Sequence, residues 1–168
     1  NGLYKTSDGG SNWQKVGLEN SERIASIVVN PENSNEIYVA AMGALWGDNE
    51  ERGVFKSNDG GQTWEKVLYV NPRTGCADLL MDPRNPSVLY ASMWEFRRTG
   101  WSFDSGGENS ALYKSIDGGK TWDKIHNGFP EGKLGRMGIA IAKSNPDVLY
   151  TVILMSSSRD SGVDFSSP

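Results

Sequence analysis

One pattern occurs three times in the sequence, as Leu3-Tyr4-Lys5-Thr6-Ser7-Asp8-Gly9-Gly10-Ser11-Asn12-Trp13, Val54-Phe55-Lys56-Ser57-Asn58-Asp59-Gly60-Gly61-Gln62-Thr63-Trp64 and Leu112-Tyr113-Lys114-Ser115-Ile116-Asp117-Gly118-Gly119-Lys120-Thr121-Trp122. Its aspartates are 51 and 58 residues apart. A second marker, an apolar run followed by a tyrosine (Tyr38, Tyr90 and Tyr150), recurs after 52 and 60 residues. Two independent markers with one spacing indicate an internal repeat.

The Asp-Gly-Gly loop has the composition of a tight connection between two strands. An aspartate side chain can accept the backbone N–H groups that such a loop leaves unpaired. The glycines allow positive φ, and a threonine suits the start of the next strand. A tryptophan there can bury a large apolar surface against the same repeat unit or its neighbour. The first unit has Asn12 in place of threonine, so we expect a looser strand start there.

Each repeat unit reads as four short strands, A to D. In the complete unit they fall around Ile27 and over 37–42, 53–57 and 63–67. No segment has apolar residues at the 3.6-residue spacing of a helix together with capping residues at its ends. Four strands in each repeat of this length are typical of a β-propeller blade, so we predict an all-β fold of four-stranded antiparallel blades.

The chain holds too few strands for a closed ring. Residues 1–155 are expected to supply strands C and D of one blade, two whole blades, and strands A and B of another, about three blades in all. The Ser-rich segment 156–168 is expected to be a polar tail or linker stub. Propellers close with 4–8 blades. The expected partners are therefore further blades of a larger propeller or a second copy of the chain.

The repeated pattern resembles the Asp-box, or BNR repeat, Ser/Thr-x-Asp-x-Gly-x-Thr-Trp. The stretches 45–53 and 93–98 make the chain similar to large bacterial proteins described as sortilin-like or glycosyl hydrolase BNR-repeat. The resemblance implies a secreted or cell-envelope protein. Because every unit repeats the box, we predict that its residues are structural: Asp8, Trp13, Asp59, Trp64, Asp117 and Trp122.

The same resemblance implies that ligands bind on the face formed by the B–C and D–A loops, opposite the Asp-boxes. The two full B–C loops, 44–52 and 94–110, are rich in aromatic and charged residues. Aromatic faces can stack on sugars or peptide side chains, and arginines can clamp carboxylates. The candidate ligand-binding residues are Trp46, Arg52, Trp94, Glu95, Arg97, Arg98 and Trp101. The alternative is that the tryptophans fill gaps between blades and that Arg52, Glu50 and Glu51 pair with neighbouring loops.

Asp78 is the candidate catalytic residue. It occupies the A-strand position that Ser26 and Gly138 hold in the other units, so it is not a repeat residue. A carboxylate there could act as general acid or base, as the resemblance to xyloglucanase-type enzymes implies. Glycoside hydrolysis normally needs a second carboxylate, for which the candidates are Asp48, Glu51, Glu95 and Asp104. The alternative is a structural aspartate bonded to the backbone. The arginine triad of a sialidase cannot be assembled.

Composition excludes several other classes. The chain has 168 residues and a net charge of −4, which argues against nucleic-acid binding. No apolar run is long enough for a membrane span. The single cysteine, Cys76, is expected to be buried, and the single histidine, His126, excludes a His-rich metal site. We expect no metal and no cofactor.

Three functions remain. The leading hypothesis is a secreted scaffold that binds peptide or glycan across its B–C/D–A face. The alternative is part of a xyloglucanase-like glycoside hydrolase acting on polysaccharide, with Asp78 near the reaction centre. The third is a structural segment whose site lies in other blades.

Overall fold

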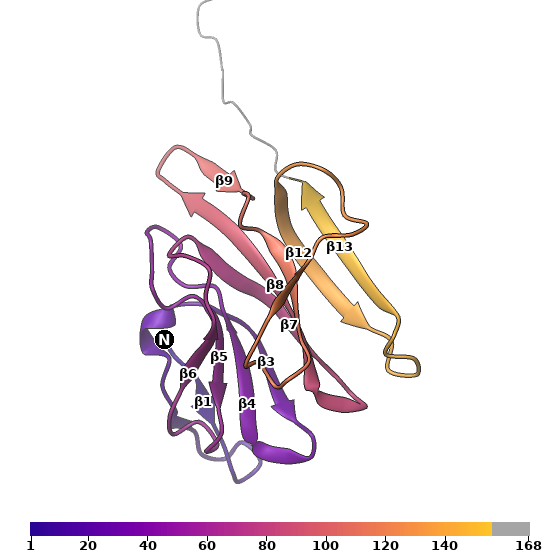
Figure 1. Cartoon of the computed structure of the whole chain (residues 1–168). Helices are drawn as coiled ribbons and strands as arrows, with labels where there is room; N and C mark the ends of the chain where they lie inside the picture. The colour runs from indigo at the N-terminus through magenta and orange to yellow at the C-terminus, as the bar shows by residue number, and fades with distance from the viewer. Residues whose placement is uncertain (156–168) are drawn as a thin grey trace, which may run out of the picture.

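The computed structural model of the chain describes residues 1–155 and consists of antiparallel strands joined by short loops (Figure 1). The predicted tail, residues 156–168, lies outside the described residues. The elements are β1 (Tyr4–Lys5), β2 (Gln14–Lys15), η1 (a 3-10 helix, Glu19–Ser21), β3 (Ile24–Asn30), β4 (Asn33–Ala41), β5 (Gly53–Ser57), β6 (Glu65–Leu68), β7 (Thr74–Asp82), β8 (Asn85–Arg98), β9 (Phe103–Ser105), β10 (Ala111–Ser115), β11 (Asp123–Ile125), β12 (Leu134–Ile141) and β13 (Leu149–Met155).

The strands form four sheets that follow one another along the chain. The sheet orders are β1-β2, β3-β4-β5-β6, β7-β8-β10-β11 with β9 added to β8, and β12-β13. Two complete four-stranded blades therefore stand between two half-blades, and the ring is open (Figure 1). The predicted all-β, partial propeller is confirmed.

The inner strands β3, β7 and β12 are neighbours, and apolar side chains fill the space between blades. The largest core cluster joins Tyr38 and Val54 of one complete blade to Leu79 and Met93 of the next. The repeat tyrosine Tyr38 is fully buried in this cluster. Cys76 is also fully buried, which raises the pKa of its thiol.

Each Asp-box is closed by its own carboxylate. Asp59 Oδ1 accepts hydrogen bonds from the N–H groups of Gln62 and Thr63, both at 2.9 Å, and from the Ser57 hydroxyl at 2.8 Å. Its Oδ2 accepts one from the Thr63 hydroxyl at 2.6 Å. Gly60 and Gly61 both have positive φ, which only glycine adopts easily. The box is therefore a self-contained loop.

The first box is closed in the same way despite its different sequence. Asn12 donates from its backbone N–H to Asp8 Oδ1 at 3.0 Å and from its side-chain amide to Asp8 Oδ2 at 2.7 Å. The amide thus replaces the threonine hydroxyl. The looser strand start that we expected is not needed, because Asn12 supplies the same two donors.

The three box tryptophans differ in burial. The Trp64 ring N–H donates to the Val16 carbonyl of the preceding half-blade at 2.7 Å. Trp122 packs against the core cluster between the complete blades. Trp13, which has no preceding blade in the described chain, is exposed. The burial of each box tryptophan therefore depends on the neighbouring blade.

Candidate functional site

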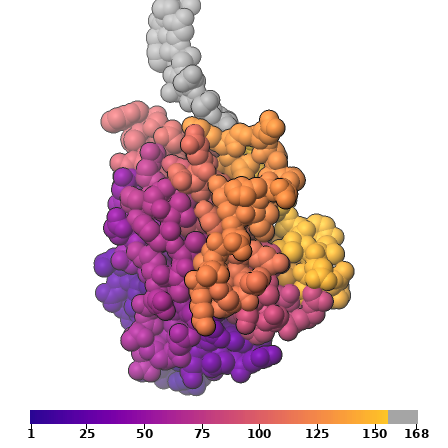
Figure 2. All heavy atoms as spheres, viewed as in Figure 1, coloured from indigo at the N-terminus to yellow at the C-terminus, as the bar shows by residue number. Residues whose placement is uncertain are grey.

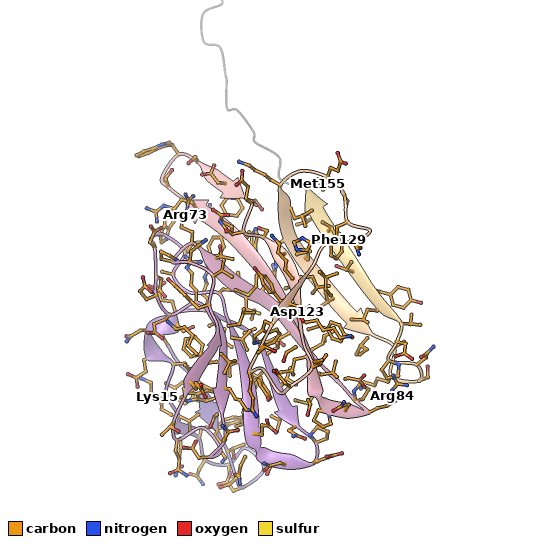
Figure 3. All side chains as sticks on the ribbon, in the orientation of Figure 1. Lys15, Arg73, Arg84, Asp123, Phe129 and Met155 are labelled. Carbon is orange, nitrogen blue, oxygen red and sulfur yellow. The ribbon has the colours of Figure 1, made fainter. Side chains whose placement is uncertain are left out.

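The Asp-boxes and the B–C loops lie at opposite ends of the blades. Gly60 N–H donates to Asn35 and Gly118 N–H to Ser87, so each box adjoins the A–B turn of its own blade. At the other end, the B–C and D–A loops contact each other: Asn49 N–H donates to the Pro72 carbonyl at 2.9 Å. Figure 3 labels Arg73 and Arg84, which lie near the two ends of β7.

An aromatic and arginine surface covers part of the B–C end. The Arg98 guanidinium lies 5.5 Å from the ring centre of Trp46 and 5.7 Å from that of Phe103. All three side chains are exposed, and they come from the β4–β5 loop, β8 and β9. We call Trp46, Arg98, Phe103 and the nearby Trp101 the aromatic strip. Two predicted ligand-binding residues, Trp46 and Arg98, are thus brought together.

Trp101 stands at the tip of a hairpin that the sequence did not reveal. We expected a loop over 94–110, but β8 continues to Arg98 and pairs with β9. The turn is closed by Thr99 and Ser102, whose hydroxyls are 2.7 Å apart and whose main chains share a hydrogen bond of 2.9 Å. The Trp101 side chain is 88% exposed. A hydrogen-bonded hairpin therefore presents this tryptophan to solvent.

Trp94 is buried and does not face solvent. Its ring stacks on Phe96 with centroids 4.4 Å apart and meets Phe103 edge-on at 6.1 Å. The Arg136 guanidinium lies 5.8 Å from the same ring. The expectation that Trp94 contacts a ligand therefore has to be revised, because its side chain is only 7% exposed and supports Phe103 from below.

Arg52 is also buried, at 1% exposure, and holds the β4–β5 loop. Its two terminal nitrogens donate to the carbonyls of Met42, Ala44 and Gly47 at 2.7, 2.7 and 3.0 Å. Phe96 lies beneath the guanidinium at 4.5 Å, and burial lowers the Arg52 pKa to about 10.

Arg52 therefore bonds to carbonyls of its own loop and not to a neighbouring loop, and the expected direct contact with a ligand has to be revised. By fixing the loop that carries Trp46, Arg52 acts as a positioning residue.

The other two predicted residues join neighbouring loops. Arg97 pairs with Asp48 of the β4–β5 loop at 3.0 Å, which links the two complete blades across the strip. Glu95 Oε2 accepts hydrogen bonds from the backbone and side-chain N–H groups of Asn109, at 3.1 and 3.0 Å. Both residues lie at the B–C end, where they stabilise the loops around the aromatic strip.

Asp78 lies on the inner strand β7, as predicted, and is half-buried. Its Oδ1 accepts a hydrogen bond from Leu79 N–H at 2.9 Å. Its Oδ2 accepts one from Ile139 N–H of β12 at 3.0 Å. Asp78 thus joins two blades, an arrangement that matches the structural alternative and leaves its catalytic role a prediction.

Of the candidate second carboxylates, Asp48 pairs with Arg97, and Asp104 lies 3.9 Å from Arg73. Glu95 is held by Asn109. These contacts hold neighbouring loops together, and a catalytic role for any of the three carboxylates stays a prediction.

A pocket at the same end was missed by the sequence reasoning. Its volume is about 170 Å³, and Lys124, His126 and Phe129 line it from one side, while Glu108 and Ser110 line it from the other. Figure 3 labels Phe129, beside β12. No repeat or motif marks these residues, because the pocket arises only where the β9–β10 and β11–β12 loops meet.

Within residues 1–155, no three His, Cys, Asp or Glu side chains are grouped as metal ligands. The same part of the chain has no helix with the length and apolar character needed to cross a membrane.

Comparison with known proteins identifies similar propellers. The chain is 26% identical over 170 residues to a xyloglucanase from Paenibacillus sp, covering 89% of this chain and 15% of that protein. Two solved structures superpose on 89% of this chain with a TM-score of 0.65. An ancestral GH74 enzyme is 20% identical, and 18% of its own length is covered. The GH74 xyloglucanase from Xanthomonas campestris is 19% identical, and 23% of its own length is covered. A GH74 enzyme from Niastella koreensis superposes with a TM-score of 0.61 at 23% identity, over 89% of this chain and 21% of its own length.

The chain thus spans less than a quarter of the length of each of these relatives, and the structural similarity shows the propeller fold. The family model described as "Sortilin, neurotensin receptor 3" matches residues 1–162, nearly the whole sequence. On that match and on its Asp-box blades, the chain belongs to the Sortilin-Vps10 family.

Proposed function

We propose that the chain is a polysaccharide-binding segment of a larger secreted or cell-envelope glycoside hydrolase-like propeller. The observation that carries this proposal is the aromatic strip, in which Trp46, Arg98 and Phe103 meet from separate loops and remain exposed. The relative described as a xyloglucanase suggests a xyloglucan-type chain as the ligand.

A glycan fits the strip better than a peptide does. Flat aromatic rings offer large apolar faces with little conformational freedom, and such faces suit the axial C–H surface of a pyranose ring. Arg98 lies between two rings, and its guanidinium N–H groups could donate to sugar hydroxyls. A peptide would instead pair its main chain with a strand edge such as that of β9, which pairs only with β8 among the described strands, and this pairing would not use the ring faces of the strip.

The test is a titration with xyloglucan oligosaccharides followed by calorimetry. Replacing Trp46→Ala or Trp101→Ala should weaken binding by about ten-fold or more each, since buried aromatic contacts dominate most interfaces. Trp46→Phe and Trp101→Phe are the matched controls and should retain most of the affinity because they keep an aromatic face. Unchanged affinity in both alanine variants would refute the proposed site.

Hydrolysis is a second candidate function, favoured by the similarity to the Paenibacillus xyloglucanase. In that case Asp78 on β7 would lie near the reaction centre. Release of reducing ends from xyloglucan by the full-length protein is the measurement. Activity that survives Asp78→Asn would remove Asp78 from the catalytic machinery and leave it as a link between β7 and β12.

A further inference from the structure

The pocket between the β9–β10 and β11–β12 loops has walls that are held by backbone hydrogen bonds. Gly107 N–H donates to the Leu134 carbonyl at 3.1 Å, and Ser110 N–H donates to the Gly107 carbonyl at 3.2 Å. Phe129 and Leu134 also pack against a core cluster, which fixes the β11–β12 loop. Figure 2 shows this part of the chain, coral to orange, at the surface turned to the viewer. The pocket is therefore formed before any ligand arrives.

Two positions of the pocket carry other residues in the first complete blade. When the blades are aligned on their box aspartates, Ser110 stands where that blade has Arg52, and His126 stands where it has Leu68. Arg52 is bonded to three carbonyls, and Leu68 is buried in the largest core cluster. The first blade thus uses both positions to hold its own fold. The second blade places a hydroxyl and an imidazole there, beside a hollow of about 170 Å³.

Lys124 supplies a positive charge to the pocket, and its ammonium is less engaged than that of the equivalent Lys66. Lys66 Nζ donates to the Glu50 carbonyl and lies 4.7 Å from the ring centre of Tyr69. In the second blade an asparagine takes the place of that ring. Lys124 Nζ donates to the Glu108 carbonyl at 3.4 Å, longer than the usual range of about 2.7–3.2 Å. An ammonium has three donors, so Lys124 has at least two to offer to a ligand.

Two further donors belong to the same pocket. Ser110 is 3% exposed and accepts a hydrogen bond from Glu95 N–H at 2.9 Å, but its own hydroxyl proton has no acceptor among the described residues. Buried polar groups are normally satisfied, so this proton calls for an acceptor that the described chain does not supply. His126 is exposed, and an imidazole carries at least one ring N–H. The pocket thus combines one full positive charge with neutral donors.

The size and the apolar wall of the pocket suit one sugar ring. Phe129 and Pro130 line it, and an aromatic face packs well against the C–H surface of a pyranose. Its volume is smaller than the roughly 300–1,000 Å³ of sites for larger ligands. Strand β9 leads from Phe103 of the aromatic strip to this wall, and Gly107 follows two residues after the strand ends. A polysaccharide on the strip would therefore have a branch or a neighbouring unit within reach of the pocket.

We propose that this pocket binds a hexuronic acid unit, the carboxylate-bearing form of a sugar. Lys124 and His126 hold the carboxylate, the Ser110 hydroxyl donates to a ring substituent, and Phe129 packs against the ring. A lone carboxylate matches the single full charge of the pocket. Glu108 carries the only negative charge among the residues that line it, and it is exposed at the rim. That the uronate belongs to the chain on the aromatic strip rests on the proposed function, whereas binding of the free sugar does not.

The test is a titration of the ¹⁵N-labelled chain with D-glucuronate, with D-glucose and with acetate. Glucuronate should shift the amide signals of Gly107, Lys124 and Gly132 and bind at least about ten-fold more tightly than the other two, because only it meets both the cation and the apolar wall. Equal affinity for glucose would overturn the role of the carboxylate. Equal affinity for acetate would overturn the sugar and leave a site for any carboxylate, such as that of an acidic peptide.

Three variants assign the effect to the pocket. Lys124→Met should lower the affinity for glucuronate by about ten-fold, and Glu108→Gln should raise it because a like charge is removed. Lys66→Met, at the equivalent position of the first complete blade, is the matched control and should bind as the wild type does. Unchanged affinity in Lys124→Met, or an equal loss in Lys66→Met, would overturn the proposal. Trp46→Ala should still bind glucuronate, so a failure of the aromatic strip and a failure of this pocket give different results.

Discussion

At the scale of single residues, the box carboxylates and Arg52 organise opposite ends of the blade through the same kind of contact, a charged group bonded to several backbone groups. Asp59 collects two backbone N–H groups and two hydroxyls. Arg52 donates to three carbonyls. In both cases a charged side chain satisfies loop backbone groups that have no strand partner, which is why these loops stay ordered without secondary structure.

The hydrogen bonds of the box carboxylates make the stability of the fold depend on pH in the acid range. Hydrogen bonds from the Thr121 hydroxyl and N–H lower the pKa of Asp117 from 3.8 to about 2. Because the folded-state pKa lies below the unfolded one, the contribution is complete above about pH 4 and is lost as the pH falls toward 2. The melting temperature of the wild type should therefore exceed that of Asp117→Asn by a margin that shrinks over this window. Thr121→Val should reduce the same margin, and a pH-independent difference would disprove the linkage.

The buried guanidinium is expected to be essential for the loop that carries Trp46. Arg52→Ala leaves three carbonyls without a donor and should lower the free energy of unfolding by about 3 kcal/mol, measured in urea. Arg52→Lys keeps the charge but cannot reach all three acceptors, so its loss should be intermediate. Both variants should weaken glycan binding while the far-ultraviolet circular dichroism spectrum stays close to that of the wild type. Normal binding by a folded Arg52→Ala would contradict the positioning role.

At the scale of elements, the repeat made the strands predictable. Alternating apolar residues, turn residues and the Asp-box located the four strands β3 to β6 of the first complete blade within about four residues, because each blade is specified by local sequence. The β8–β9 hairpin was missed, because its residues Thr99 to Ser102 form a turn that no other unit shares. The aromatic strip was only partly predicted. Phe103 lacked a repeat signal, and the burial of Arg52 and Trp94 depends on contacts between loops distant in sequence.

The Tyr38 hydroxyl makes the joint between the two complete blades testable. Tyr38→Phe removes the hydroxyl whose single proton is shared between Glu36 Oε1 at 2.8 Å and the Gly118 carbonyl at 2.9 Å, so it should lower the free energy of unfolding by about 1–2 kcal/mol. Tyr113→Phe is the matched control. Its ring packs on the same cluster, but its hydroxyl has no hydrogen-bond partner among residues 1–155, so the change should be small. Equal effects of the two variants in thermal unfolding would argue against a stabilising role for the Tyr38 hydroxyl.

At the scale of the whole molecule, the repeated residues and the residues of the proposed binding site lie in different parts of the propeller. Repeated residues lie at the Asp-box end or between blades, whereas the residues of the aromatic strip occur once and lie at the B–C end. The proposed function thus assigns stability and recognition to different residues. Substitutions in the strip should change affinity while leaving unfolding nearly unchanged, since its side chains are exposed.

The most direct measurement is a titration of the ¹⁵N-labelled protein with a xyloglucan oligosaccharide, followed through the indole N–H signals of its six tryptophans. The account predicts that the signals of Trp46 and Trp101 shift, while those of the box residues Trp13, Trp64 and Trp122 stay in place. Shifts confined to the box tryptophans, or none at saturating oligosaccharide, would contradict it.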